Sequence, residues 1–107
     1  MPNRNYVNGV RWENEVKKAF EDAGWFVIRS AGSRGLFDLA VFGNGNFLLI
    51  QCKLKRKPTE GEEDAMRDMA RFCRAEYAYL VKSEEYAQQF IMNIKKCTEM
   101  IKEDLMG

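Results

Sequence analysis

An acid, an amide and a lysine lie close together on two neighbouring apolar segments of this chain. Asp38 belongs to the first segment, and Gln51 and Lys53 follow the second. Carboxylate and amide oxygens are suitable ligands for a hard cation such as Mg²⁺. A lysine ammonium can hold a phosphate or help to deprotonate a water. The combination favours metal-assisted phosphodiester chemistry. The alternative is an ordinary amphipathic hairpin with a polar outer face.

A hairpin turn would bring these three residues together. Apolar runs at residues 37–42 and 47–50 flank Gly-Asn-Gly-Asn, and Asn-Gly favours a two-residue turn with positive φ at both positions. That register pairs Gly43 with Asn46 and places Asp38 opposite Gln51 on one face of the sheet. Strand alternation keeps Lys53 on the face of Gln51 and turns the Cys52 side chain the other way.

Composition favours one compact domain whose metal ligands are oxygen atoms. The chain has 107 residues, and 46% of them are apolar. Its three widely spaced cysteines fit neither a disulfide framework nor a zinc site. Because there is no histidine, Mg²⁺ or Mn²⁺ is favoured over zinc. No membrane-spanning run or signal peptide is evident, so a reducing cytoplasm without membrane contact is the expected location.

The net charge of +1 is unevenly distributed. Residues 1–57 hold ten Lys and Arg against five Asp and Glu, a net +5, whereas residues 58–107 hold seven against eleven, a net −4. The basic half ends in residues 53–57, which carry four positive charges. This asymmetry favours a first half that faces a polyanion. A solvated strand end or a localisation signal is the alternative interpretation of the basic run.

The first helix is predicted from a strong apolar stripe. Residues 1–7 are expected to form a loose arm, and the helix is expected to run from an Asn8-Gly9 cap to a stop at Gly24. Glu13 and Glu15 fall on opposite borders of the stripe, and periodicity does not show which one leans over a neighbouring sheet. The stripe consists of Trp12, Val16, Ala19, Phe20 and Ala23.

The remaining segments complete an α/β pattern. A strand is expected at residues 25–28, and a small-residue loop with two arginines follows at residues 29–35, where backbone amides and guanidinium groups suit a phosphate. Glycine and serine also form ordinary turns. After the hairpin, Thr59 and Glu62 form a capping box for a helix to residue 74. A strand at residues 77–81 and a helix from Ser83 to residue 104 follow. The predicted fold is a single α/β domain, α-β-β-β-α-β-α, with a mixed sheet flanked by helices.

Four of these segments together resemble the PD-(D/E)XK nuclease superfamily, and within it the archaeal-type Holliday junction resolvases. They are Gly-Val-Arg-Trp-Glu-Asn-Glu at residues 9–15, Arg-Ser-Ala-Gly-Ser at 29–33, Phe37-Asp38, and Gln-Cys-Lys-Leu-Lys at 51–55. They occur in the family order with similar spacing. The Arg-Ser-Ala-Gly-Ser segment is the most specific to resolvases.

The resemblance implies a restriction-endonuclease-like fold and an Mg²⁺-dependent endodeoxyribonuclease, with Mn²⁺ as a substitute, that acts on four-way junctions or other branched DNA in recombination and repair. The implied catalytic residues are Glu13, Ser33, Asp38, Gln51 and Lys53. The implied metal ligands are Glu13, Asp38, Gln51 and the backbone carbonyl of Cys52. The candidates for DNA contacts are Arg11, Arg29, Ser30, Arg34, Lys55, Arg56 and Lys57.

A two-fold dimer is also expected. A four-way junction needs two symmetric cuts, and a pair of sites related by a two-fold axis is the simplest way to place them. The last predicted helix carries an apolar stripe that is either a dimer seam or core packing. The stripe consists of Phe90, Ile94, Cys97, Ile101 and Leu105.

Three features depart from the resolvase pattern. Gln51 stands where resolvases usually have glutamate, which resembles the Mrr-like branch of the superfamily, and Phe37 stands where the motif name has proline. Residues 83–107 read as helical, whereas resolvases of this type usually finish with a strand. The alternatives are therefore an Mrr-like restriction or repair nuclease, a non-catalytic DNA-binding module on the same fold, and a protein-interaction domain that uses the last helix.

Overall fold

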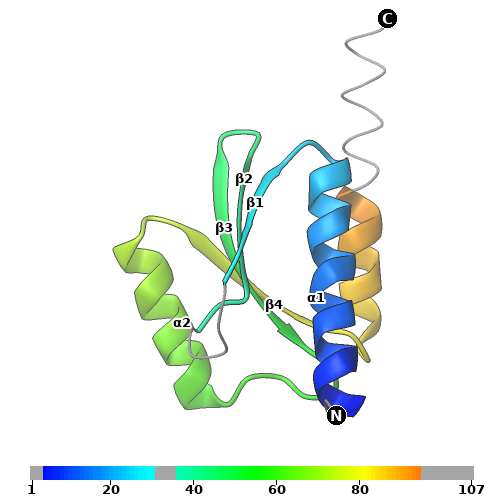
Figure 1. Ribbon diagram of the computed structural model, residues 1–107. Helices are drawn as coiled ribbons and strands as arrows, with labels where there is room; N and C mark the ends of the chain where they lie inside the picture. Colours follow the sequence, from blue (N-terminus) through cyan, green and yellow to red (C-terminus); the bar gives the residue numbers. More distant parts are fainter. Residues whose placement is uncertain (1–3, 31–35, 95–107) are drawn as a thin grey trace, which may run out of the picture.

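The computed structural model describes residues 4–30 and 36–94, and its elements follow the predicted order (Figure 1). The predicted α/β fold with a mixed sheet is confirmed. A last helix covers residues 85–94. The labelled elements are α1 (Arg4–Asp22), β1 (Phe26–Arg29), β2 (Leu39–Gly43), β3 (Asn46–Lys53), α2 (Glu60–Phe72) and β4 (Glu76–Val81).

The four strands form one sheet in the order β1-β2-β3-β4. The first two pairings are antiparallel, and β4 pairs in parallel with β3 after the α2 crossover. Asn44 and Gly45 form the hairpin turn with φ of 53° and 77°, and Gly43 pairs with Asn46, as predicted. This register matters for the site, because a slip of one residue would move every side chain of the strand to the opposite face.

Helices lie on both faces of the sheet. α1 and the helix at residues 85–94 share one apolar core with β2, β3 and β4, whereas α2 lies against the opposite face (Figure 1). Trp12 fixes α1 to the sheet, because its buried indole Nε1–H donates to the carbonyl oxygen of Leu80 at 3.0 Å. Phe20 packs edge-on against Trp25, with 5.3 Å between the ring centroids. Burial of such side chains stabilises the fold by about 1.5–3 kcal/mol each.

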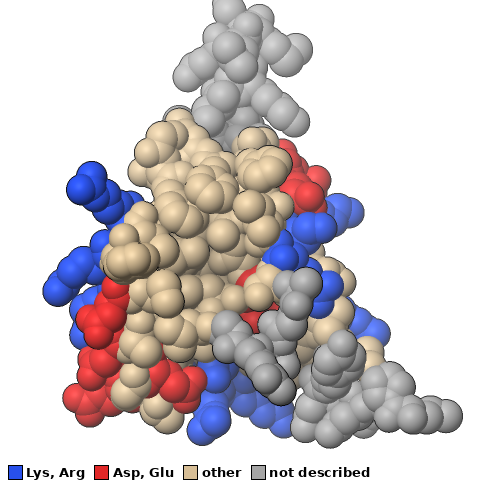
Figure 2. Space-filling model, turned by 60° about the vertical axis from the view of Figure 1, so that its left-hand side comes forward, with Lys and Arg blue, Asp and Glu red and all other residues tan. Residues whose placement is uncertain are grey.

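The face of the sheet opposite α1 carries exposed apolar side chains. Phe26 is 66% exposed and Ile28 is 49% exposed. The ring of Phe42 stacks on Phe47 at 4.3 Å between centroids and lies 6.3 Å from that of Phe26. Figure 2 shows a broad surface without charged side chains on this side of the molecule, with charged groups around its edges. We call Phe26, Ile28, Phe42 and Phe47 the aromatic patch.

Two predicted helix boundaries differ from the structure. α1 begins at Arg4, so the expected loose arm is wrong from residue 4 onward, and residues 1–3 lie outside the described part. Gly9 is accommodated inside the helix instead of capping it, at a cost of roughly 1 kcal/mol relative to alanine. The last helix begins at residue 85 and not at Ser83, which lies in a turn and donates its hydroxyl to the carbonyl oxygen of Lys55 at 3.4 Å.

The described part of the last helix packs into the core. Phe90 and Ile94 lie against the buried cluster, so this part of the apolar stripe is core packing. Cys97, Ile101 and Leu105 lie outside the described residues. No helix in the described ranges is long and apolar enough to cross a membrane.

Candidate active site

Asp38 lies at the point where β2 and β3 separate. Its backbone N–H donates to the carbonyl oxygen of Ile50 at 2.9 Å, and its own carbonyl oxygen accepts from Ser30 N–H at 2.9 Å. Oδ2 of its carboxylate accepts from the backbone N–H of Cys52 at 2.8 Å. The carboxylate therefore continues the β2–β3 ladder in place of a backbone carbonyl. A charge-assisted bond of this kind fixes the position of the acid.

Glu13 brings a second carboxylate from α1 to Asp38. Burial raises the pKa of Glu13, and the charge of Asp38 and a hydrogen bond between the two carboxyl groups raise it further. Arg29 opposes this shift, since its Nε and Nη2 donate to Oε2 of Glu13 at 3.3 and 3.1 Å. Two adjacent carboxylates disfavour each other's ionised form, and a cation between them removes that repulsion.

The structure also distinguishes the two glutamates that periodicity left open. Glu13 faces Asp38, whereas Oε1 of Glu15 accepts from Nζ of Lys82 at 3.5 Å. Lys82 follows β4, on the far edge of the sheet from β1. Of the two glutamates, Glu13 is thus the one that lies beside Asp38.

Cys52 contributes only its backbone to this site. Burial raises the pKa of its thiol, and the charges of Asp38 and Glu13 raise it further, so the thiol stays protonated near neutral pH. The side chain packs against the core under α1. Its backbone N–H is taken by Asp38, and its carbonyl remains the group proposed as a metal ligand.

Gln51 and Lys53 belong to the opposite face of β3. Lys53 donates from Nζ to Oε2 of Glu62 on α2 at 3.3 Å. Oε1 of Gln51 is buried and accepts no hydrogen bond from any residue in the described ranges. A buried amide oxygen without a donor costs about 1–3 kcal/mol. Such an atom calls for an additional partner, and a bound cation or water is the usual one.

The donor set fits a hard divalent cation. Glu13 and Asp38 supply carboxylates that repel each other, and Gln51 supplies an amide oxygen for which the described part of the chain offers no donor. Within the described residues, no group of three or more His, Cys, Asp or Glu side chains could hold a metal. Among the described residues, further ligands of a cation held by these two acids would be amide, backbone or water oxygens, which are groups that Mg²⁺ and Mn²⁺ accept.

The basic run lies next to this site. A surface cleft lined by Gly9 and residues 52–56 opens between α1 and the end of β3. The side chains of Lys55, Arg56 and Lys57 are exposed, as is that of Arg11. Ser33 and Arg34, which were also predicted as site residues, lie outside the described part of the chain.

Two predicted DNA contacts have partners within the protein. Arg29 is engaged by Glu13, and the backbone N–H of Ser30 is engaged by Asp38. The partner of Lys53 was missed: Glu62 was predicted only as a capping residue. Glu62 lies at the start of the helix that follows the basic run, and this position was the available sequence signal for the contact. The contact itself requires α2 to fold back on β3.

The chain is similar to known proteins in sequence and in fold. A family model described as archaeal Holliday junction resolvase (Hjc) matches residues 4–100. The crossover junction endodeoxyribonuclease Hjc of Methanocaldococcus jannaschii is 42% identical over 52 residues, which cover 49% of this chain and 38% of that protein. The structure of Archaeoglobus fulgidus Hjc, a Holliday junction resolvase, matches with a TM-score of 0.60 and 24% identity, over 70% of this chain and 64% of that chain. The chain thus spans less than two thirds of either protein.

Proposed function

Because this chain belongs to the archaeal Holliday junction resolvase family of the PD-(D/E)XK nucleases, we propose that it is a metal-dependent endonuclease that cleaves four-way junctions or other branched DNA. The observation that carries the proposal is the meeting of Glu13 and Asp38 where β2 and β3 separate. The basic run beside these two acids suits an anionic substrate.

The metal would be Mg²⁺, with Mn²⁺ as a substitute, held by Glu13, Asp38, the amide oxygen of Gln51 and the carbonyl of Cys52. A bound cation of this kind lowers the pKa of the attacking water and offsets charge on the phosphoryl oxygens. Arg29 keeps the Glu13 carboxylate in place through its two donated bonds.

The lysine and the basic run would act on the substrate. The ammonium group of Lys53 positions the attacking water and stabilises charge that develops on the phosphate. Lys55, Arg56 and Lys57 contact phosphates around the cleft, which positions the DNA without reading its bases. The resemblance adds Ser33 near the scissile phosphate and Arg11 and Arg34 as further phosphate contacts.

A cleavage assay tests the proposal. The purified protein is incubated with a four-way junction, a linear duplex and a single strand, each with Mg²⁺, Mn²⁺ or EDTA. We expect metal-dependent nicking of the junction, and loss of nicking with retained binding in Asp38→Asn. Asp68→Asn, at an exposed position of α2, is the matched control and should cleave normally. Equal cleavage of linear duplex would favour an Mrr-like nuclease, and binding without nicking would favour a non-catalytic module.

We also propose that the protein forms a two-fold dimer through the aromatic patch. Exposed apolar patches of this kind mark interaction sites. A second copy is the occupant that the substrate requires, since two symmetric cuts need two sites. Light scattering should show a dimer for the wild type and a monomer for Phe26→Glu, whereas Met92→Glu, also at an exposed apolar position, should remain dimeric. A monomeric wild type, both free and on junction DNA, would contradict the dimer.

A further inference from the structure

We propose that Glu62 is a positioning residue that holds the ammonium group of Lys53 for cleavage, and that it supplies beside Lys53 the negative charge that Gln51 lacks. The inference rests on the proposed function, in which Lys53 acts at the scissile phosphate. The four motif segments all lie before residue 58. With Glu62, α2 also contributes a residue to the site.

The contact joins two separate elements. Lys53 ends β3 and Glu62 lies in the first turn of α2, and Nζ lies 3.3 Å from Oε2. The two side chains are only 23% and 34% exposed. A lysine side chain is long and flexible, so an ammonium group without a fixed partner samples many positions. A carboxylate held by the protein removes much of that freedom.

Glu62 is itself held by the helix cap. Its Oε1 accepts from the hydroxyl of Thr59 at 3.1 Å, and its backbone N–H donates to that hydroxyl at 3.2 Å. The cap therefore uses one carboxylate oxygen and Lys53 uses the other. A capping box is formed by glutamine as well as by glutamate. The cap alone does not need the negative charge, and the charge serves the lysine.

The negative charge of Glu62 also compensates for a charge that is missing from β3. Gln51 precedes Lys53 by two residues on the same face of β3, and its amide is neutral. Its Oε1 accepts no hydrogen bond within the described residues, so it does not hold the ammonium group. Glu62 thus places on α2 the anion that β3 does not supply. A carboxylate at position 51 or at position 62 should hold the ammonium group of Lys53. Moving the negative charge from one position to the other therefore tests the proposal.

The test measures single-turnover cleavage of a four-way junction at saturating protein, together with junction affinity. Glu62→Gln keeps the capping atoms but should lower the cleavage rate about tenfold or more, because misplacement of a reacting group is costly. Affinity should stay equal or improve, since an anion has been removed near DNA. Adding Gln51→Glu should return the rate to within about threefold of Gln51→Glu alone, as expected for coupled residues.

Two further variants separate positioning from folding. Glu60→Gln removes a charge from the same helical turn and should leave the rate unchanged. Glu62→Asp, which keeps the charge, should retain more of the rate than Glu62→Gln. An unchanged or faster Glu62→Gln, or a loss that Gln51→Glu does not restore, overturns the proposal for Glu62. A wild type that cleaves no junction with either metal overturns the proposed function itself.

Discussion

Replacing Lys55, Arg56 and Lys57 with alanine should flatten the salt dependence of DNA binding and leave the fold intact. All three side chains are exposed, and the first two line the cleft beside the candidate site. The local backbone is held by other groups, since Lys55 uses its carbonyl oxygen to accept from Ser83. The substitutions therefore remove charge without removing a contact that supports the sheet.

The expected magnitude follows from the number of phosphates that these residues neutralise. Each neutralised phosphate adds about 0.9 to the slope of log K against log salt on duplex DNA, so three contacts contribute about 2.7. Between about 50 and 200 mM salt, the advantage of the wild type over the triple variant should then shrink by a factor of about 40. If only one of the three side chains contacts a phosphate, the change in slope should be about 0.9.

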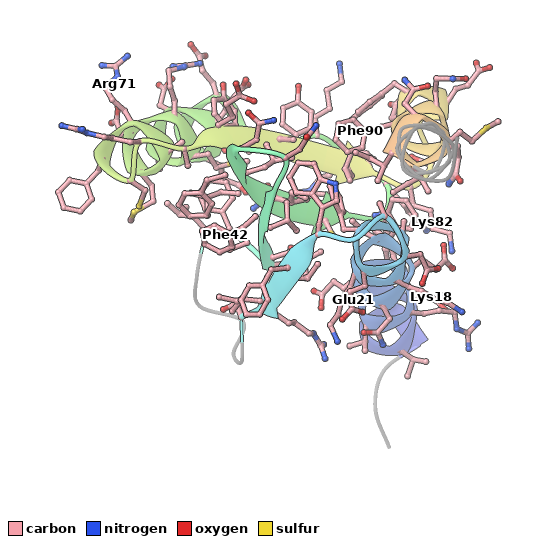
Figure 3. All side chains as sticks on the ribbon, turned by 90° about the horizontal axis from the view of Figure 1, so that it is seen from above. Lys18, Glu21, Phe42, Arg71, Lys82 and Phe90 are labelled. Carbon is pink, nitrogen blue, oxygen red and sulfur yellow. The ribbon has the colours of Figure 1, made fainter. Side chains whose placement is uncertain are left out.

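The assay is fluorescence anisotropy with a labelled junction at several salt concentrations, with Asp38→Asn in every protein to prevent cleavage. The matched control is the double variant Lys18→Ala and Arg71→Ala, whose side chains project into solvent from α1 and α2 (Figure 3). The control should change the slope little. If the triple variant changes the slope no more than the control does, the basic run is only a solvated strand end.

Three further predictions concern the scaffold and the acids. Trp12→Phe removes the N–H that donates to the carbonyl oxygen of Leu80, and urea unfolding should show a loss of about 0.5–1.5 kcal/mol from this hydrogen bond, with no loss contradicting it. Gly43→Ala places a Cβ 2.6 Å from the ring of Trp25 and should cost about 1–3 kcal/mol, whereas a neutral result would mean that the indole can move. Because the pKa of Glu13 is raised, its carboxyl group becomes protonated at a higher pH than that of an ordinary glutamate as the pH falls. The Mn²⁺ affinity measured by calorimetry should therefore weaken already at mildly acidic pH. A pH-independent affinity would exclude Glu13 as a ligand.

The hairpin was predictable because its determinants are local. Asn44 and Gly45 adopt the positive φ that a two-residue turn requires, and the turn then fixes every strand pair up to Leu39 with Ile50. The capping box at Thr59 and Glu62 is equally local and forms as predicted. The start of α1 was less predictable, because a helix-breaking preference at Gly9 is small compared with the packing of the stripe that follows it.

Contacts between elements distant in the sequence were beyond sequence reasoning. The bond between Lys53 and Glu62 depends on how α2 packs on the sheet, and a cap signal at Glu62 does not specify that packing. The exposure of Phe26 and Phe42 likewise depends on how the helices pack on the sheet. Their apolar types predict burial, but they lie on the face opposite α1 and remain exposed.

The candidate site differs from the single-face patch that strand alternation predicts, because the sheet opens at Asp38. One residue before β2, the pleat no longer fixes the direction of the side chain, and the carboxylate turns to the N–H of Cys52 and to Glu13. Lys53 lies on the other face with Glu62. A site at the separation of two strands can thus collect acids from the α1 side and a lysine from the α2 side. This explains why both helices, and not the hairpin alone, determine the position of its charged groups.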